Sequence, residues 1–148
     1  MQSEKIDELK CIEAHENEIL SIDYAEQHFG KKQKLSVSSN KDKANFLVSG
    51  SRDTLIQIYD TSNDYEPIQI IEEHQSTVTT VKFVKQKDQG EGASIALLTG
   101  GADKQINKFV FNEGQKVNDF EPFKQVEKIT QDNKIFSMDV AHNMKSGK

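Results

Sequence analysis

The sequence contains no tryptophan, only two prolines, and a single cysteine, Cys11, among its 148 residues. A single cysteine cannot form an internal disulfide, and no histidine or acid around it has the spacing of a nucleophilic site. We interpret Cys11 as a buried structural thiol in a reducing compartment. The cytoplasm is therefore the expected location.

Long apolar runs are absent as well. No run approaches the roughly 18 residues that a membrane helix needs, and the charged start MQSEKIDELK lacks the apolar core of a signal peptide. The net charge of -5 argues against a nucleic-acid-binding surface. We therefore expect neither a membrane nor a nucleic acid as a partner. The apolar residues still come in short ordered runs, which predicts one folded domain.

Two stretches of the chain occur twice. AHENEILSIDY (14–24) matches EHQSTVTTVKF (73–83), because in each a histidine stands four residues before the β-branched residue of an apolar strand. LVSGSRDTLIQIYD (47–60) matches LLTGGADKQINKFV (97–110), where a strand ends in Ser/Thr-Gly and an aspartate precedes the next strand. A third copy opens at DNKIFSMDVA (132–141). Such self-similarity is typical of a repeat protein.

Each repeat predicts four antiparallel strands, because segments rich in Ile, Val, Phe and Thr are bounded by turn residues. The first unit covers about 12–72, the second about 73–131, and a third begins at about 132–141. For Ser3–Ile12 a short helix and an outer strand are both open. The expected strands are Ile19–Tyr24, Phe46–Gly50, Leu55–Tyr59, Pro67–Ile71, Thr77–Val84, Ile95–Thr99, Ile106–Phe111, Lys124–Ile129 and Ile135–Val140.

These motifs resemble the WD40 repeat, in which a histidine, a serine or threonine, a turn aspartate and an aromatic residue form a structural tetrad. The resemblance implies an all-β partial propeller of two four-stranded blades and the start of a third. Phe109 has no polar group, so we expect the second tetrad to lose its last link and Asp103→Ala to cost less than Asp53→Ala. The implied tetrads are His15, Ser49, Asp53 and Tyr59, and His74, Thr99, Asp103 and Phe109.

The order of the motifs along residues 10–140 is similar to one family of WD-repeat scaffolds, which bind mitogen-activated protein kinases and have a spindle-pole paralogue linked to microcephaly. This resemblance implies a cytoplasmic, centrosomal or microtubule-associated scaffold that gathers kinases of the JNK pathway. A structural component of a ciliary or microtubule assembly is the alternative. Two blades cannot close a ring of 4 to 8, so a longer chain or a partner copy is expected to supply the others.

A propeller presents loops on a rigid platform, so we expect a protein-binding module without catalysis or cofactor. An enzyme would need a coupled acid/base pair or a metal site, and His15 and His74 stand one repeat apart with no further ligand at suitable spacing. KKQKLSV (31–37) loosely matches kinase-docking peptides, while a solvated loop is the simpler interpretation. The expected partner contacts are Glu16, Asn17, Arg52, Gln75, Ser76 and Lys104.

Overall fold

The computed structural model describes residues 7–28, 43–87, 93–111 and 121–141 of the chain. Within these ranges the regular structure is β-strand, apart from one short 3-10 helix, η1 (Thr61–Asn63). The predicted all-β fold class is therefore confirmed. The strands are β1 (Ile19–His28), β2 (Lys43–Ser51), β3 (Ile56–Asp60), β4 (Glu66–Ile71), β5 (Val78–Lys87), β6 (Ala93–Gly101), β7 (Gln105–Phe111) and β8 (Phe123–Thr130).

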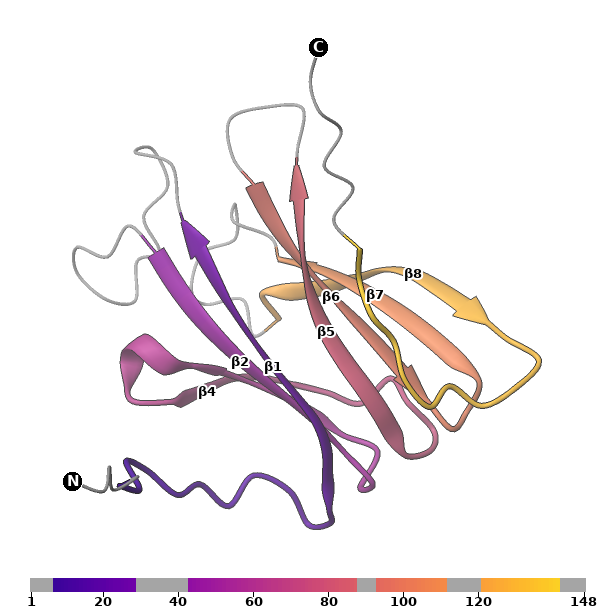
Figure 1. Cartoon of the computed structure of the whole chain (residues 1–148), viewed down its shortest axis with the longest axis horizontal. Coiled ribbons are helices and arrows are strands. Elements are labelled where there is room, and N and C mark those ends of the chain that lie inside the picture. The colour runs from indigo at the N-terminus through magenta and orange to yellow at the C-terminus, as the bar shows by residue number, and fades with distance from the viewer. Residues whose placement is uncertain (1–6, 29–42, 88–92, 112–120, 142–148) are drawn as a thin grey trace, which may run out of the picture.

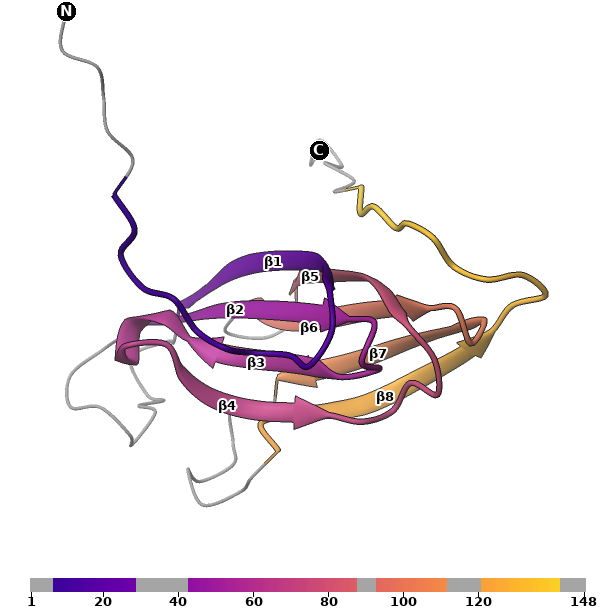
Figure 2. The same cartoon turned by 90° about the horizontal axis from the view of Figure 1, so that it is seen from below.

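The strands form two antiparallel sheets of four, each with its strands in chain order. We call the sheet β1–β4 the first blade and the sheet β5–β8 the second blade. The blades stand next to each other, with β5 against β1 and β2 (Figure 1). Seen from below, the strands of each blade follow one another from β1 to β4 and from β5 to β8 (Figure 2). Sequential antiparallel strands can be joined by short turns, as between β2 and β3 and between β6 and β7.

A single hydrophobic core lies between the two blades. Its apolar side chains alternate along β2 and β3, as Phe46 with Val48 and Ile56 with Ile58, because successive side chains of a strand point to opposite sides. Four phenylalanines extend this core, with ring centroids 5.2 to 6.4 Å apart among Phe46, Phe83, Phe111 and Phe123. Burying each of the rings of Phe46, Phe111 and Phe123 contributes about 1.5–3 kcal/mol, and Phe83 packs against them partly buried. The other core residues are Ala25, Val48, Ile56, Ile58, Ile71, Val78, Val81, Ile95, Leu97 and Phe109.

Polar side chains also join the blades. The buried Gln69 of β4 donates from Nε2 to the Phe123 carbonyl at 2.9 Å and accepts from the Phe123 N–H at 2.8 Å. This pairing satisfies a buried amide that would otherwise cost about 1–3 kcal/mol. The Gln69 side chain thus joins β4, the last strand of the first blade, to the start of β8, the last strand of the second blade.

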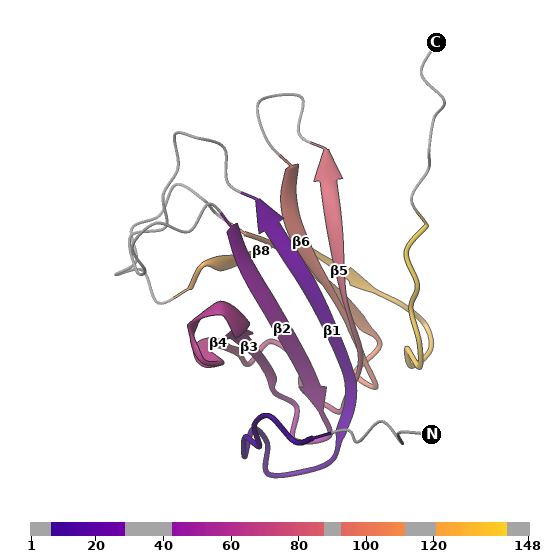
Figure 3. The same ribbon diagram turned by 60° about the vertical axis from the view of Figure 1, so that its left-hand side comes forward.

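A second set of hydrogen bonds joins β1 and β5, the first strands of the two blades, which lie side by side (Figure 3). The N–H of Val81 donates to Ser21 Oγ at 3.1 Å, and the N–H of Phe83 donates to Asp23 Oδ2 at 2.7 Å. Ser21 and Asp23 are two residues apart, so both point from β1 toward β5. The side chains of one blade thus satisfy backbone donors at the edge of the next.

The stretch Ile135–Val140 is not a strand, so this part of the prediction is wrong. Its first residue is nevertheless held, because the Ile135 N–H donates to the Gly101 carbonyl at 3.1 Å and the Thr79 hydroxyl donates to the Ile135 carbonyl. Alternating apolar residues favour a strand, but a ladder also needs a second strand of the same blade. The described part of the chain supplies none for this third copy.

The segment before the first blade also differs from expectation. Residues 7–12 form neither a helix nor a strand, and Leu9 is 91% exposed. A helix of this length is marginal without packing, and the segment is held by an ion pair of Lys10 with Asp64 at 2.8 Å. Cys11 is exposed rather than buried, because it lies in this uncovered segment.

Candidate functional site

The turn between β2 and β3 positions Asp53. Its N–H donates to Ser51 Oγ at 3.1 Å, and its Oδ1 accepts from the Leu55 N–H at 2.9 Å. Thr54 adopts a φ of 76°, a left-handed conformation that β-branched residues seldom take. Lys104, which follows Asp103 in the same place of the second blade, has a φ of 67°. Both repeats therefore build the same tight turn around an aspartate.

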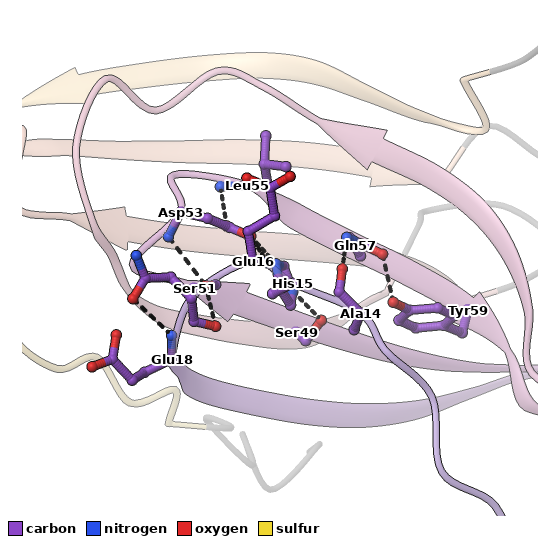
Figure 4. Close-up of polar contacts among 11 residues, drawn as sticks. Ala14, His15, Glu16, Glu18, Ser49, Ser51, Asp53, Leu55, Gln57 and Tyr59 are labelled. Atoms are coloured by element: carbon purple, nitrogen blue, oxygen red, sulfur yellow. Dashed lines mark hydrogen bonds and ion pairs between the residues drawn. The ribbon is translucent and has the colours of Figure 1, made fainter.

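His15 connects this turn to the strand beside it (Figure 4). Its Nδ1 lies 2.8 Å from Asp53 Oδ2, and its Nε2 lies 2.7 Å from Ser49 Oγ. The His15 side chain is fully buried. Because a carboxylate can only accept, Nδ1 carries a proton and donates to Asp53, while Nε2 shares a hydrogen bond with the serine hydroxyl, which can donate or accept. The structure thus brings three of the four residues implied for the first tetrad into one hydrogen-bonded chain.

The fourth residue, Tyr59, is buried in the same region. Its hydroxyl donates to Gln57 Oε1, and Gln57 Nε2 donates to the Ala14 carbonyl (Figure 4). Burial raises the pKa of Tyr59, and hydrogen bonding with Ser49 offsets part of that rise. We call His15, Ser49, Asp53, Gln57 and Tyr59 the first polar cluster. It anchors the chain before β1 to the middle of the first blade.

Asp53 supplies the carboxylate of this cluster. Burial acts to raise the pKa of its carboxyl, but hydrogen bonds from the Leu55 N–H, from His15 and from the Glu16 N–H outweigh that effect. The pKa of Asp53 is therefore held below its ordinary value. The carboxylate is kept ionised because the fold surrounds it with donors.

The second blade repeats the arrangement. His74 Nδ1 lies 2.9 Å from Asp103 Oδ2, and its Nε2 lies 2.8 Å from Thr99 Oγ1. Phe109 is buried in the hydrophobic core, where it contributes area instead of a hydrogen bond. Phe109 cannot supply the polar group that a tyrosine would bring to the cluster. Asn107 supplies one instead, since its Nδ2 lies 3.3 Å from His74 Nε2. We call His74, Thr99, Asp103, Asn107 and Gln125 the second polar cluster, because Gln125 Nε2 donates to Asn107 Oδ1 at 3.0 Å.

Gln57 and Asn107 were missed by sequence reasoning. Both stand directly opposite the hydroxyl residue across the strand pair, in the pairings Ser49 with Gln57 and Thr99 with Asn107. The sequence does contain a signal, since each amide residue follows its turn aspartate by the same four positions. A polar residue repeated inside an apolar strand indicates a buried partner.

The connectivity Asp53–His15–Ser49 is that of a Ser-His-Asp triad, in which histidine activates a hydroxyl. Catalysis would require a substrate carbonyl to reach the hydroxyl. Ser49 is only 4% exposed, and Thr99, its counterpart in the second blade, is fully buried. Both hydroxyls are enclosed between strands and the preceding loop. The arrangement is suited to holding the blade together.

The residues expected to contact partners gather at one end of the blades. The turn residue Arg52 lies beside the loop before β1, because its N–H donates to the Glu18 carbonyl at 3.0 Å. The corresponding turn of the second blade meets the loop before β5, where the Ala102 N–H donates to the Thr77 carbonyl at 2.9 Å. Arg52 also pairs with the Glu18 side chain at 3.1 Å on the surface. Exposed at this loop end are Glu16, Asn17, Arg52, Gln75 and Lys104, with Ser76 half-buried.

Other sequence motifs fall in different places. The lysine-rich stretch 31–37 lies outside the described residues. Among the residues that the structure describes, no group of three or more His, Cys, Asp or Glu could hold a metal ion. In the same ranges, no helix has the length and apolar character to cross a membrane.

Comparison with known proteins points to WD-repeat proteins. No family model matches the chain. It is 30% identical over 142 residues, 96% of its length, to mitogen-activated protein kinase-binding protein 1 of Homo sapiens, and 28% identical over 135 residues to WD repeat-containing protein 62 of Sus scrofa. The chain spans only 8% and 7% of these relatives. The resemblance inferred from the motifs is thereby confirmed, and these homologues support a protein-interaction scaffold.

Proposed function

We propose that this chain, a homologue of the WD-repeat scaffolds just described, is a non-catalytic part of a larger propeller that binds proteins through its loop end. The observation that carries the proposal is the repeated polar cluster. In both blades a buried histidine and aspartate hold the turn and the preceding loop in one fixed arrangement. Rigid loops on a stable scaffold are typical of protein-recognition surfaces. On this proposal, the tetrad residues support the scaffold and carry out no chemistry.

The finer proposal concerns the partner. One relative is named for binding a mitogen-activated protein kinase, and we propose a kinase of that class as the partner of this chain, in the cytoplasm or at the spindle pole. The exposed cations Arg52 and Lys104 stand at matching turns of the two blades. Surface charges of this kind steer encounter and are screened by salt. Binding at the loop end should therefore weaken as the ionic strength rises.

The test is capture of a purified mitogen-activated protein kinase by the full chain. We expect Arg52→Glu and Lys104→Glu each to weaken capture about threefold or more, because each reverses a charge at the loop end. Lys124→Glu is the matched control, since Lys124 is the second residue of β8, at the end of the strand away from the Lys104 turn. Equal loss in all three variants, or capture that salt does not weaken, would contradict binding at this end.

A structural role in a microtubule assembly predicts a different result. The chain would then co-sediment with polymerised microtubules, while purified kinase would not be retained at any ionic strength. That outcome would replace the signalling scaffold by a permanent structural component, without altering the account of the two polar clusters.

A further inference from the structure

The same packing contact, a glycine against a β-branched side chain of the next repeat, occurs twice along the chain. A Cβ placed on Gly50 would lie 2.7 Å from Val78 Cγ1, and a Cβ placed on Gly100 would lie 2.7 Å from Ile135 Cγ2. Each glycine thus leaves a pit at the end of a second strand, and the next repeat fills it with a β-branched side chain. A side chain at either glycine would clash with its neighbour.

The first blade carries the same β-branched position, and there it is uncovered. Ile19 stands four residues after His15, as Val78 stands four residues after His74. Val78 is fully buried, whereas Ile19 is 48% exposed. The described residues therefore include three such side chains, Ile19, Val78 and Ile135, and two pits, at Gly50 and Gly100, which Val78 and Ile135 already fill.

The neighbouring positions of β1 show the same difference. Ile22 pairs with Ser49 as Val81 pairs with Thr99, so the two are equivalent. Val81 is fully buried against the first blade, but Ile22 is 64% exposed. Tyr24, the equivalent of Phe83 in this register, is 48% exposed. We call Ile19, Ile22 and Tyr24 the β1 face.

We propose that the β1 face docks on a further four-stranded blade of defined chemistry, an inference that rests on the proposed place of this chain in a larger propeller. The partner blade ends its second strand in a glycine whose pit receives Ile19. Its first strand carries a serine and an aspartate two residues apart, as Ser21 and Asp23 do toward β5. These two side chains accept from the edge N–H groups of Ile22 and Tyr24.

A second copy of the chain does not meet these requirements. In such a copy the second blade would have to receive Ile19, on the side that faces away from the first blade. There Thr80 and Lys82 stand in the positions of Ser21 and Asp23. A lysine ammonium has no lone pair to accept a hydrogen bond from a backbone N–H. The glycine pit on that side, at Gly100, is moreover occupied by Ile135 of the same copy. The first blade has the required glycine and the Ser21 and Asp23 pair, but β5 already covers that side. The partner blade is therefore a further one, distinct from the two described here.

The experiment converts the second blade into the predicted partner. The full chain with Lys82→Asp and Ile135→Gly gains an acceptor and loses the side chain that fills the pit. The backbone of residue 135 still bonds to Gly101 and Thr79, so Ile19 of a second copy has to displace it, and we expect the variant to associate head to tail with increasing concentration in sedimentation equilibrium. The wild-type chain should remain monomeric. Adding Ile19→Asp should weaken the association about tenfold or more, because it removes a buried isoleucine from the contact.

The matched control combines Lys85→Asp with Ile135→Gly, which makes the same charge change on the opposite face of β5. This control should associate far less than the Lys82 variant. If circular dichroism shows that Ile135→Gly unfolds the second blade, Ile135→Ala is used instead. The alanine still removes most of the side chain that fills the pit. A folded Lys82 variant that stays monomeric, association that Ile19→Asp leaves unchanged, or wild-type self-association through Ile19 would each overturn the proposal. Kinase capture by the loop end is measured separately, so its failure would be distinguished from failure of this docking.

Discussion

Asp53 and Asp103 each hold three groups in place. Asp53 accepts from His15, from the Glu16 N–H at 3.1 Å and from the N–H two residues further along the chain. Asp103 does the same with His74 and the Gln75 N–H at 3.0 Å. Each aspartate therefore fixes both its own turn and the loop that leads into the first strand of its blade. Removing one leaves a buried imidazole N–H without its acceptor.

The depressed pKa of Asp53 predicts a dependence of stability on pH. Its folded pKa lies below the ordinary value of 3.8, so ionised Asp53 stabilises the fold fully above about that pH, and this contribution is lost as the pH falls through the folded pKa. Asp53→Asn lacks the charge at every pH. We expect the difference in unfolding free energy between wild type and Asp53→Asn to be constant from neutral pH down to about 5 and to shrink below about 4.

Urea unfolding at a series of pH values measures this difference. Glu66→Gln is a suitable control, because Glu66 is exposed on β4. A difference that grows as the solution becomes acidic would contradict the assignment of Asp53 as an ionised acceptor.

At the level of strands, the sequence predicts correctly the apolar segments that belong to a complete four-stranded blade. The eight strands of the two blades lie where the repeats place them, because Gly, Asn and Asp mark their turns. β1 runs on to His28 and β2 begins at Lys43, beyond the predicted ends. There the hairpin continues by backbone pairing after the apolar alternation has ended. Ile135–Val140 shows the converse, an apolar pattern without a partner strand.

The polar clusters were predicted less completely than the strands. The spacing of histidine, hydroxyl and aspartate in each repeat carries the resemblance to WD40, and the structure places these residues within hydrogen-bonding distance. The role of Asn107 could not be read from that spacing, because cross-strand register decides which side chain meets the imidazole. The same register makes Phe109 a core residue.

This finding changes the expected cost of removing each aspartate. We now expect Asp53→Ala and Asp103→Ala to destabilise the chain by similar amounts, about 1–3 kcal/mol each, since Asn107 completes the second polar cluster. Equilibrium unfolding of the two variants, with Lys124→Ala as a surface control, measures the costs. A much smaller cost for Asp103→Ala would show that Asn107 does not compensate for the missing polar group of Phe109.

On the scale of the whole molecule, the blades are joined at both ends of their sheets, through their first strands and through their last strands. β1 holds β5 through Ser21 and Asp23, and β4 holds β8 through Gln69. The hydrophobic core between them is continuous. Neither blade buries both of its faces alone, which is the usual condition of a repeat unit. We therefore regard the pair as two adjacent propeller blades that fold together.

Hydrogen exchange of the Asp53→Ala variant, followed by mass spectrometry, tests this claim most directly. The substitution lies in the first blade, yet we predict faster exchange in peptides from both blades, by roughly 5- to 150-fold for a cost of 1–3 kcal/mol. β6 and β7 are the informative strands, because they are the central strands of the other sheet. Faster exchange confined to β1–β4, with β6 and β7 unchanged, would contradict the account of two interlocked blades.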